Sequence, residues 1–180
     1  MSYRPPELLG PAHELDTFSC TSVEQTDWLK RHARQSMATA TTKVFVVTAA
    51  DGRSVVAYYA WTMAQITVAD APARLRKGAG SYPQPVALLA RLGVHRDHER
   101  QGLGAALLRD VIQRVAVISN DIGCRGLLVH CESERARDFY LHLIPEFELS
   151  PTDELHLVLL LKDIKRTLQD NGTDRCATPV

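Results

Sequence analysis

The sequence predicts a single α/β domain in which strands and helices alternate along the chain. Between Leu88 and Ile118, an apolar run passes through a charged turn and two glycines into a segment with helical periodicity. From Gly126 to Leu143, a short apolar run is again followed by a helical pattern. The chain has 180 residues, 45% of them hydrophobic, and shows no internal repeat, so one ordinary hydrophobic core is expected.

The first helix is predicted from Cys20 to Met37. Thr21 and Glu24 have the spacing of a capping box at its start. Apolar residues fall on one face of this helix, namely Trp28, Leu29 and Ala33. Basic residues stand beside them, so one side of the helix is expected to pack and the other to face solvent.

A hairpin and a long loop are expected next. Strand-like runs cover Lys43–Ala49 and Ser54–Val68, and they are joined at Asp51-Gly52, a dipeptide typical of two-residue hairpin turns. The segment from Ala69 to Pro85 is rich in glycine and proline. It therefore predicts a loop long enough to be functional or mobile.

The second half of the chain predicts further strand and helix pairs. A buried strand is expected at Gly126–Cys131, followed by a helix at about Glu134–Leu143. A last strand is predicted at Glu154–Leu161 and a short helix at Lys162–Leu168. The domain is therefore expected to span residues 1–168, with a polar, disordered tail at residues 169–180.

The glycine pair at the start of the central helix predicts an anion-binding turn. The first N–H groups of a helix lack an intrahelical acceptor and carry the positive end of its dipole, so they attract phosphate. Gly102 and Gly104 would let an anion approach the backbone. Ala105 after the second glycine excludes a P-loop, and Leu107 replaces the third glycine of a dinucleotide fingerprint. A glycine-rich helix start without any ligand remains the alternative.

Gly93 interrupts the apolar run that precedes this turn. A glycine inside a strand marks either a bulge or a place where another group lies against the backbone. A bulge would expose backbone amides just before the predicted phosphate site.

Together, the interrupted strand and the turn resemble the acetyl-CoA site of the GNAT N-acetyltransferases. The family signature is Gln/Arg-x-x-Gly-x-Gly/Ala. The segment from Glu99 to Gly104 matches it at both glycines, but its first position holds Glu99 in place of Gln or Arg. The resemblance implies a mixed, mostly antiparallel sheet with a bulged central strand and a V-shaped splay, flanked by helices. It also implies acetyl-CoA as cofactor, bound at this part of the site by Leu92, Gly93, Val94, Arg100, Gln101, Gly102, Leu103, Gly104 and Ala105.

A second GNAT-like motif follows the next strand. Residues Ser133 to Tyr140 resemble the family's Asn-x-x-Ala-x-x-Phe/Leu-Tyr, with serine in place of asparagine. The resemblance implies that Ser133, Ala136, Phe139 and Tyr140 contact the cofactor and that Tyr140 is catalytic. A phenol, with a reference pKa of about 10, can give its proton to a departing thiolate, whose reference pKa is about 8.5. The Val94 N–H is the expected oxyanion donor. A purely packing role for the Tyr140 ring is the alternative.

The resemblance becomes narrower when the whole chain is considered. From Leu8 to Leu168 the chain is similar to the TacT-type GNAT toxins of bacterial type II toxin–antitoxin modules. The matching pieces are Phe18–Cys20, Asp27–Leu29, Val56–Ala60, Arg91–Val94, Val129–His130, Phe139–Tyr140 and Ser150–Thr152. This resemblance implies acetylation of the α-amino group of aminoacyl-tRNA, which inhibits translation. It further implies a homodimer neutralised by a ribbon-helix-helix antitoxin, with DNA bound only through the antitoxin complex.

Charge and nucleophile chemistry agree with an aminoacyl-tRNA substrate. An α-amino group has a reference pKa of about 7.7–8.0, against about 10.4 for lysine, so much of it is neutral without a strong base. No acidic residue lies between Asp70 and Asp97. Such a surface suits phosphates and RNA shape. The residues expected to contact tRNA are Lys30, Arg31, Arg34, Arg74, Arg76, Lys77, Arg91 and Arg96.

Two other functions stay open at this stage. An acetyltransferase for a small amine, such as a polyamine, would want an acidic pocket, and a non-catalytic acyl-CoA-binding module would fit the departures at Glu99 and Ser133. The four cysteines form no Cys-x-x-Cys pair, so reduced structural thiols and no metal site are expected. The chain also lacks a transmembrane-length apolar run and a signal-peptide pattern, which predicts a cytoplasmic protein.

Overall fold

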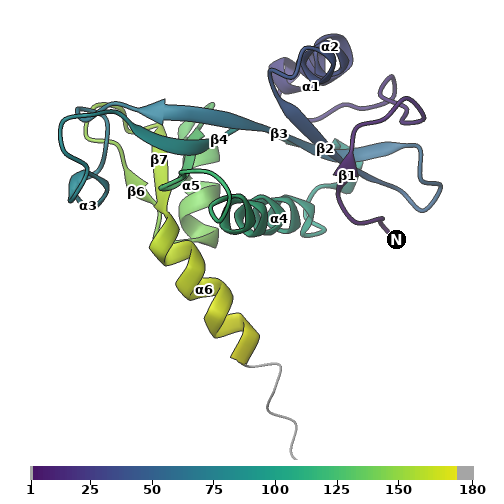
Figure 1. Ribbon diagram of the computed structural model, residues 1–180. Helices are drawn as coiled ribbons and strands as arrows, with labels where there is room; N and C mark the ends of the chain where they lie inside the picture. The colour runs from purple at the N-terminus through teal and green to yellow at the C-terminus, as the bar shows by residue number, and fades with distance from the viewer. Residues whose placement is uncertain (1, 174–180) are drawn as a thin grey trace, which may run out of the picture. The chain divides into compact units, whose positions relative to one another are not determined.

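The computed structural model describes residues 2–173 (Figure 1). Its strands are β1 (Glu7–Leu8), β2 (Lys43–Thr48), β3 (Val55–Ile66), β4 (Gln84–Val94), β5 (Gly126–His130), β6 (Glu148–Leu149) and β7 (His156–Leu160). They form a seven-stranded sheet in the order β1-β2-β3-β4-β5-β7-β6. Pairing is mostly antiparallel, with β4 and β5 parallel, which confirms the predicted α/β fold with a mixed sheet.

The chain divides into two compact units. One consists of the residues up to 62 together with 89–110, and the other of 63–88 together with the residues from 111 onward. The long elements β3 and β4 and the central helix α4 (Leu103–Ile118) contribute residues to both units. Within the described part of the chain, no helix has the length and apolar character needed to cross a membrane.

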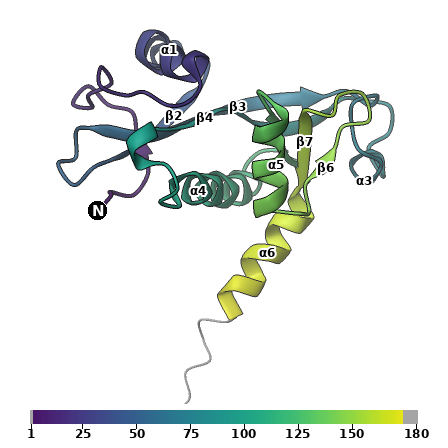
Figure 2. The same cartoon turned by 180° about the vertical axis from the view of Figure 1, so that it is seen from behind.

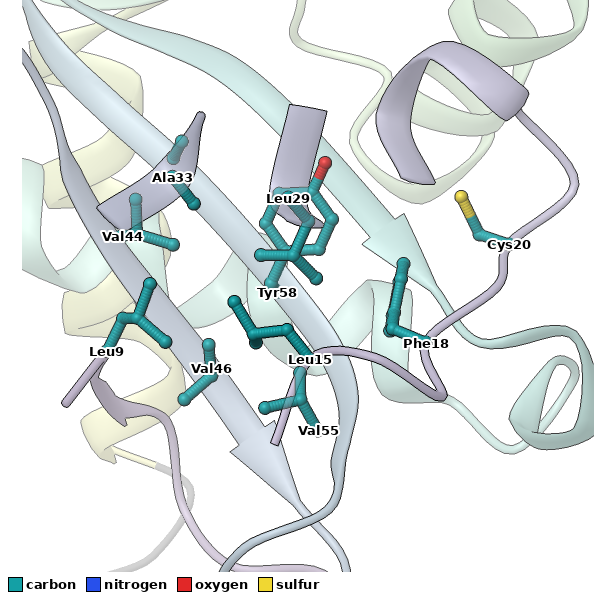
Figure 3. Packing of buried hydrophobic residues seen from close by; sticks show 11 residues of the cluster. Leu9, Leu15, Phe18, Cys20, Leu29, Ala33, Val44, Val46, Val55 and Tyr58 are labelled. Carbon is teal, nitrogen blue, oxygen red and sulfur yellow. The ribbon is translucent and has the colours of Figure 1, made fainter. Parts of the chain in front are cut away.

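In the first unit, two short helices lie over the N-terminal strands. Strand β2 pairs antiparallel with both β1 and β3. Helices α1 (Val23–Arg31) and α2 (Ala33–Ala38) bury Leu29 and Ala33 completely. Figure 3 shows these two side chains in one buried cluster with Val44, Val46 and Tyr58 from the strands. The first helical segment therefore contributes its apolar face to the core, as its periodicity predicts.

The predicted single helix from Cys20 to Met37 is wrong, because the chain forms two helices here. His32 separates them with φ −120°, outside the usual helical range. Its N–H closes α1 by donating to the Trp28 carbonyl at 2.9 Å, and its carbonyl opens α2 by accepting from the Ser36 N–H at 2.9 Å. The apolar spacing continues across this break, which is why periodicity alone joins the two helices.

Helix α1 begins at Val23 and not at the predicted Cys20, and its N-cap is one residue later than predicted. Ser22 is the N-cap, and its hydroxyl accepts from the Gln25 N–H at 3.2 Å. Thr21, the predicted cap, instead donates its hydroxyl to Glu99 Oε1 at 2.7 Å. Thr21 and Ser22 both carry a hydroxyl that could cap the helix. The Thr21 hydroxyl binds Glu99, and the Ser22 hydroxyl caps α1.

The β2–β3 connection is wider than the predicted two-residue turn. The Ala49 N–H donates to the Ser54 carbonyl at 3.0 Å, so four residues lie between these partners. Gly52 adopts φ +70°, which favours glycine. The Asp51 carboxylate accepts from the N–H groups of Arg53 at 2.9 Å and Ser54 at 3.0 Å. The Asp-Gly pair makes the turn, while the aspartate side chain organises a longer loop.

In the second unit, strand β7 pairs antiparallel with β5 and β6. Helix α5 (Glu134–Leu143) has the predicted bounds, whereas the two-residue strand β6 was not predicted. The predicted loop at residues 69–85 contains a short helix, α3 (Ala73–Arg76), and gives way to β4 at Gln84. Leu75 of α3 is buried with Val86, Leu128 and Val158. Burial of this one leucine explains why a helical turn forms inside a glycine-rich segment.

Helix α6 (Leu161–Thr173) continues directly from β7 and runs away from that strand (Figure 2). Its first turn is held to the unit by the buried residues Asp163 and Ile164. The helix is longer than the predicted Lys162–Leu168, so the predicted start of the tail at residue 169 lies inside it. Residues 174–180 of the predicted tail lie outside the described residues.

Candidate active site

The turn before α4 has the backbone expected of an anion cradle. The first backbone hydrogen bond of the helix runs from the Ala106 N–H to the Gly102 carbonyl at 3.0 Å. The N–H groups of Leu103, Gly104 and Ala105 therefore belong to the first turn, which lacks intrahelical acceptors. Arg100 and Gly102 adopt positive φ values of 59° and 79°. Apart from its two chain neighbours, a Cβ built on Gly102 would meet no described atom within 4 Å, so the backbone is open here to an approaching anion.

Glu99, the departure from the GNAT signature, has a partner inside the protein. Its Oε1 accepts the hydroxyl hydrogen of Thr21. The carboxylate is thus directed to the segment before α1. This bond gives Glu99 a structural use at the edge of the turn.

Gly93 is a site of close approach within the first unit. A Cβ on this residue would lie 2.8 Å from Cε1 of Tyr58 and 3.5 Å from Sγ of Cys20. The Tyr58 ring cannot easily withdraw, because its hydroxyl donates to the Gln25 carbonyl at 2.7 Å and its ring stacks on Trp28. Of the two explanations for this glycine, the structure supports the close approach. The bulge, and with it the role of the Val94 N–H, stays a prediction.

Helix α5 carries the second predicted motif. Ser133 is its N-cap, and the serine hydroxyl accepts from the Ala136 N–H at 3.2 Å. Serine is among the best N-cap residues, so its presence in place of asparagine preserves the helix start. The side chain that the motif assigns to the cofactor therefore also has a structural role.

Tyr140 lies on the buried side of α5 with only 7% of its surface exposed. Its ring makes edge contacts with Phe139, at a centroid distance of 5.2 Å, and with Phe147, at 6.0 Å. Burial raises the pKa of the Tyr140 phenol, and the nearby Cys131 thiol raises it further. Burial likewise raises the pKa of Cys131 to about 11. Both the phenol and the thiol therefore carry their protons at neutral pH. Of the two, only the Tyr140 phenol was predicted to be catalytic.

Three of the eight predicted tRNA contacts are used in bonds within the protein. Arg34 donates to the carbonyls of Gly10 at 3.0 Å and His13 at 2.7 Å. Arg91 pairs with Glu24 at 2.5 Å and lies over the Trp28 ring. Arg74 binds Glu148 at 2.6 Å and Asp163 at 2.9 Å. The sequence shows these charges but not their partners, which lie up to 89 positions away.

The other five cations remain available on the surface. All five are exposed, and within the described residues none has a hydrogen bond or ion pair through its side chain; they are Lys30, Arg31, Arg76, Lys77 and Arg96. They come from α1, from the loop around α3 and from the turn after β4.

Two residues that the sequence analysis missed hold the loop around α3. The Arg125 guanidinium donates to the carbonyls of Leu75 at 2.9 Å and Lys77 at 3.3 Å, and to Gln84 Oε1 at 2.7 Å. Gln84 in turn donates to the carbonyls of Ala79 at 3.1 Å and Tyr82 at 2.8 Å. Nothing in the local sequence around Arg125 signals this role, since all of its acceptors lie at least 41 positions away.

The cysteines of the described chain lie in the interior. Cys20, Cys124 and Cys131 are free and buried, and Cys176 lies outside the described residues. The same part of the chain holds no group of three or more His, Cys, Asp or Glu side chains placed to bind a metal ion.

Comparison with known proteins decides the family. Residues 11–143 match the Acetyltransferase (GNAT) family. The chain belongs to the GNAT acetyltransferases. The sequence is 40% identical over 168 residues to the tRNA-acetylating toxin of Mycobacterium tuberculosis, covering 93% of this chain and 98% of that protein. It is 29% identical to the probable toxin TacT of Sinorhizobium fredii, covering 86% and 88% of the two chains.

Solved GNAT structures show the same fold. A crystal structure of a KacT mutant superposes with a TM-score of 0.84 at 21% identity, covering 93% of this chain and 99% of that chain. AtaT complexed with acetyl-methionyl-tRNAfMet gives a TM-score of 0.83 at 23% identity, with the same coverage of both chains. At this level of identity, the structural likeness supports the fold.

Proposed function

We propose that the protein transfers an acetyl group from acetyl-CoA to the α-amino group of aminoacyl-tRNA and acts as the toxin of a toxin–antitoxin module. The observation that carries this proposal is the 40% identity, over 93% of the chain, to a tRNA-acetylating toxin. The open turn before α4 and the buried phenol of Tyr140 support the same chemistry.

The residues at the two motifs fit acetyl-CoA. The N–H groups of Leu103, Gly104 and Ala105 at the helix start, with Arg100 beside them, suit a pyrophosphate. When bound, acetyl-CoA supplies an acetyl thioester whose transfer to an amine releases a thiolate. Tyr140 holds a proton at its phenol oxygen, and its raised pKa keeps the phenol protonated at neutral pH, as a general acid for the departing thiolate requires.

The structure reduces the number of candidate tRNA contacts. We assign tRNA binding to the five cations that have no internal partner in the described chain, Lys30, Arg31, Arg76, Lys77 and Arg96. Arg34, Arg74 and Arg91 are not included in this assignment, because each already donates hydrogen bonds within the protein. Separate cations on exposed surface suit contacts to the RNA backbone, which carry no sequence information.

The partners follow from the toxin assignment. AtaT has been solved bound to the C-terminus of its antitoxin AtaR, and a KacTA complex has been solved with DNA. By analogy, we propose a ribbon-helix-helix antitoxin, DNA contact only through that antitoxin, and a homodimer acting on charged tRNA in the cytoplasm.

The direct test uses purified protein and total aminoacylated tRNA. Incubation with acetyl-CoA labelled in the acetyl group should give labelled N-acetyl-aminoacyl-adenosine after nuclease digestion, detected by mass spectrometry. The same tRNA, deacylated beforehand, should stay unlabelled. Labelling of polyamines instead of charged tRNA would indicate a small-amine acetyltransferase. Binding of acetyl-CoA without any acetylation would indicate a non-catalytic acyl-CoA-binding module.

A further inference from the structure

A tyrosine near the N-terminus reaches the turn before α4. The Tyr3 hydroxyl donates to Gln101 Oε1 at 2.6 Å and lies 3.0 Å from His98 Nδ1. The Tyr3 ring also contacts the His98 ring edge-on, at a centroid distance of 5.6 Å. One side chain therefore joins the residues just before and within the GNAT signature, across more than 90 positions of sequence.

Tyr3 can act as an anchor because its own backbone is fixed. It forms an antiparallel bridge with Ala49, and the neighbouring Arg4 N–H donates to the Thr48 carbonyl at 3.0 Å. The Arg4 guanidinium also packs against Gly52, where a Cβ would lie 2.6 Å from its Cζ. The N-terminal segment is thus attached to the β2–β3 hairpin.

The Tyr3 hydroxyl is a donor in one of its two hydrogen bonds and an acceptor in the other. A tyrosine hydroxyl has one hydrogen, which is donated to Gln101, so in its contact with His98 it acts as acceptor. This requires the hydrogen of the neutral His98 ring to be on Nδ1. The His98 ring in turn contacts His95 edge-on, and His95 contacts the buried Phe18 in the same way. The residues leading into the turn are therefore supported by a row of packed rings.

The turn needs such support, because it contains a strained residue. Arg100 adopts φ +59°, a left-handed conformation that costs free energy for any residue other than glycine. It is flanked by two residues whose side chains are held from the N-terminal segment, Glu99 by Thr21 and Gln101 by Tyr3. These contacts fix the turn on both sides of the strained position.

We propose that Tyr3 is a positioning residue for acetyl-CoA, which keeps the turn of residues 99–102 in the conformation that receives the pyrophosphate. This rests on the proposed assignment of the turn to acetyl-CoA. A preformed turn does not have to be ordered when the cofactor binds, so losing the Tyr3 hydroxyl weakens binding without removing any group that touches the cofactor.

The test is Tyr3→Phe, which keeps the ring and removes the hydroxyl. The dissociation constant for acetyl-CoA, measured by calorimetry, should rise about three- to tenfold, as for the loss of one hydrogen bond. KM for acetyl-CoA should rise with kcat unchanged. The matched control is Tyr82→Phe, since Tyr82 is 75% exposed, and this variant should bind acetyl-CoA like the wild type.

A truncated acetyl donor separates positioning from a general structural effect. S-acetylpantetheine lacks the pyrophosphate, so Tyr3→Phe should use it as well as the wild type does. An equal loss with both donors would overturn the proposal, as would an unchanged dissociation constant for acetyl-CoA. Gly104→Glu, which places a carboxylate at the turn, tests the underlying assignment independently. If Gly104→Glu abolishes acetyl-CoA binding and Tyr3→Phe has no effect, the role of Tyr3 is wrong and the assignment of the turn stands. If the wild type itself does not bind acetyl-CoA, the proposed function fails.

Discussion

At the scale of single residues, Tyr140 is both a buried side chain and the proposed proton donor. A tyrosine packed between Phe139 and Phe147 has the surroundings of an ordinary core residue. The same surroundings raise its pKa, so the phenol keeps its proton near neutral pH. Packing and catalysis are therefore compatible roles for this side chain, and only a substitution that separates them can tell which is in use.

Tyr140→Phe makes that separation. It removes the hydroxyl and keeps the ring, so the melting temperature and the affinity for acetyl-CoA should change little. The acetylation rate should fall by about 10²- to 10⁴-fold, the usual contribution of general acid catalysis. Single-turnover acetylation of charged tRNA is the measurement. A rate within about threefold of wild type would show that Tyr140 has only a packing role.

At the scale of elements, an ion-pair cluster joins three short segments of the second unit. Arg74 of α3 binds Glu148 of β6 and Asp163 of α6, and Arg166 also reaches Asp163 at 3.0 Å. The Asp163 side chain is fully buried, so its charge depends on these partners. The arginines, Arg74 above all, hold the pKa of Asp163 below its ordinary value. The cluster is therefore structural. Replacing Arg74 by an acidic residue would destabilise the fold as well as change the surface charge.

Acid should expose the contribution of Asp163. A carboxylate whose pKa is lowered by folding stabilises the protein above its ordinary pKa of about 4, and this stabilisation is lost as the pH falls toward the lower, folded-state pKa. Asp163→Asn should lower the free energy of unfolding at pH 7 and reduce its fall between about pH 4 and pH 2. Urea unfolding at several pH values measures both, with the exposed Glu146→Gln as control. An unchanged pH dependence in Asp163→Asn would contradict the assignment.

The free cations of the α3 loop should be separable from that cluster. Replacing Arg76 and Lys77 by glutamate leaves Arg74 paired, so the fold should be retained while tRNA binding weakens. The slope of log K against log salt concentration should become shallower by about 2, one unit for each phosphate that the variant no longer binds. Arg109→Glu with Lys165→Glu changes the net charge equally at other exposed positions. If this control pair reduces the slope as much, net charge and not the loop accounts for binding.

At the scale of the whole molecule, local patterns predicted the fold class, and long-range bonds account for what they missed. The strand, glycine turn and helix from Leu88 to Ile118 are encoded by neighbouring residues, as is α5, whose predicted bounds match. The choice of Ser22 over Thr21 as the helix cap goes with the bond from Thr21 to Glu99, 78 positions away, which periodicity does not contain. The same limit applies to charge, since the pairing of Arg74 is decided by an aspartate 89 positions away. The bulge, the splay and the cofactor contacts stay predictions.

The hydrogen bonds by which Arg125 and Gln84 hold the loop around α3 also affect how easily a protease can cleave that loop. Arg76 and Lys77 are exposed and offer trypsin two cleavage sites in a segment without strand structure. Yet the Lys77 carbonyl, which trypsin would have to attack, is held by Arg125, and the carbonyls of Leu75 and Ala79 are held by Arg125 and Gln84. Exposed loops are normally where nicking begins. We expect native protein to resist brief trypsin digestion here and Arg125→Gln to be cleaved after Arg76 or Lys77, as mass mapping of the fragments would show.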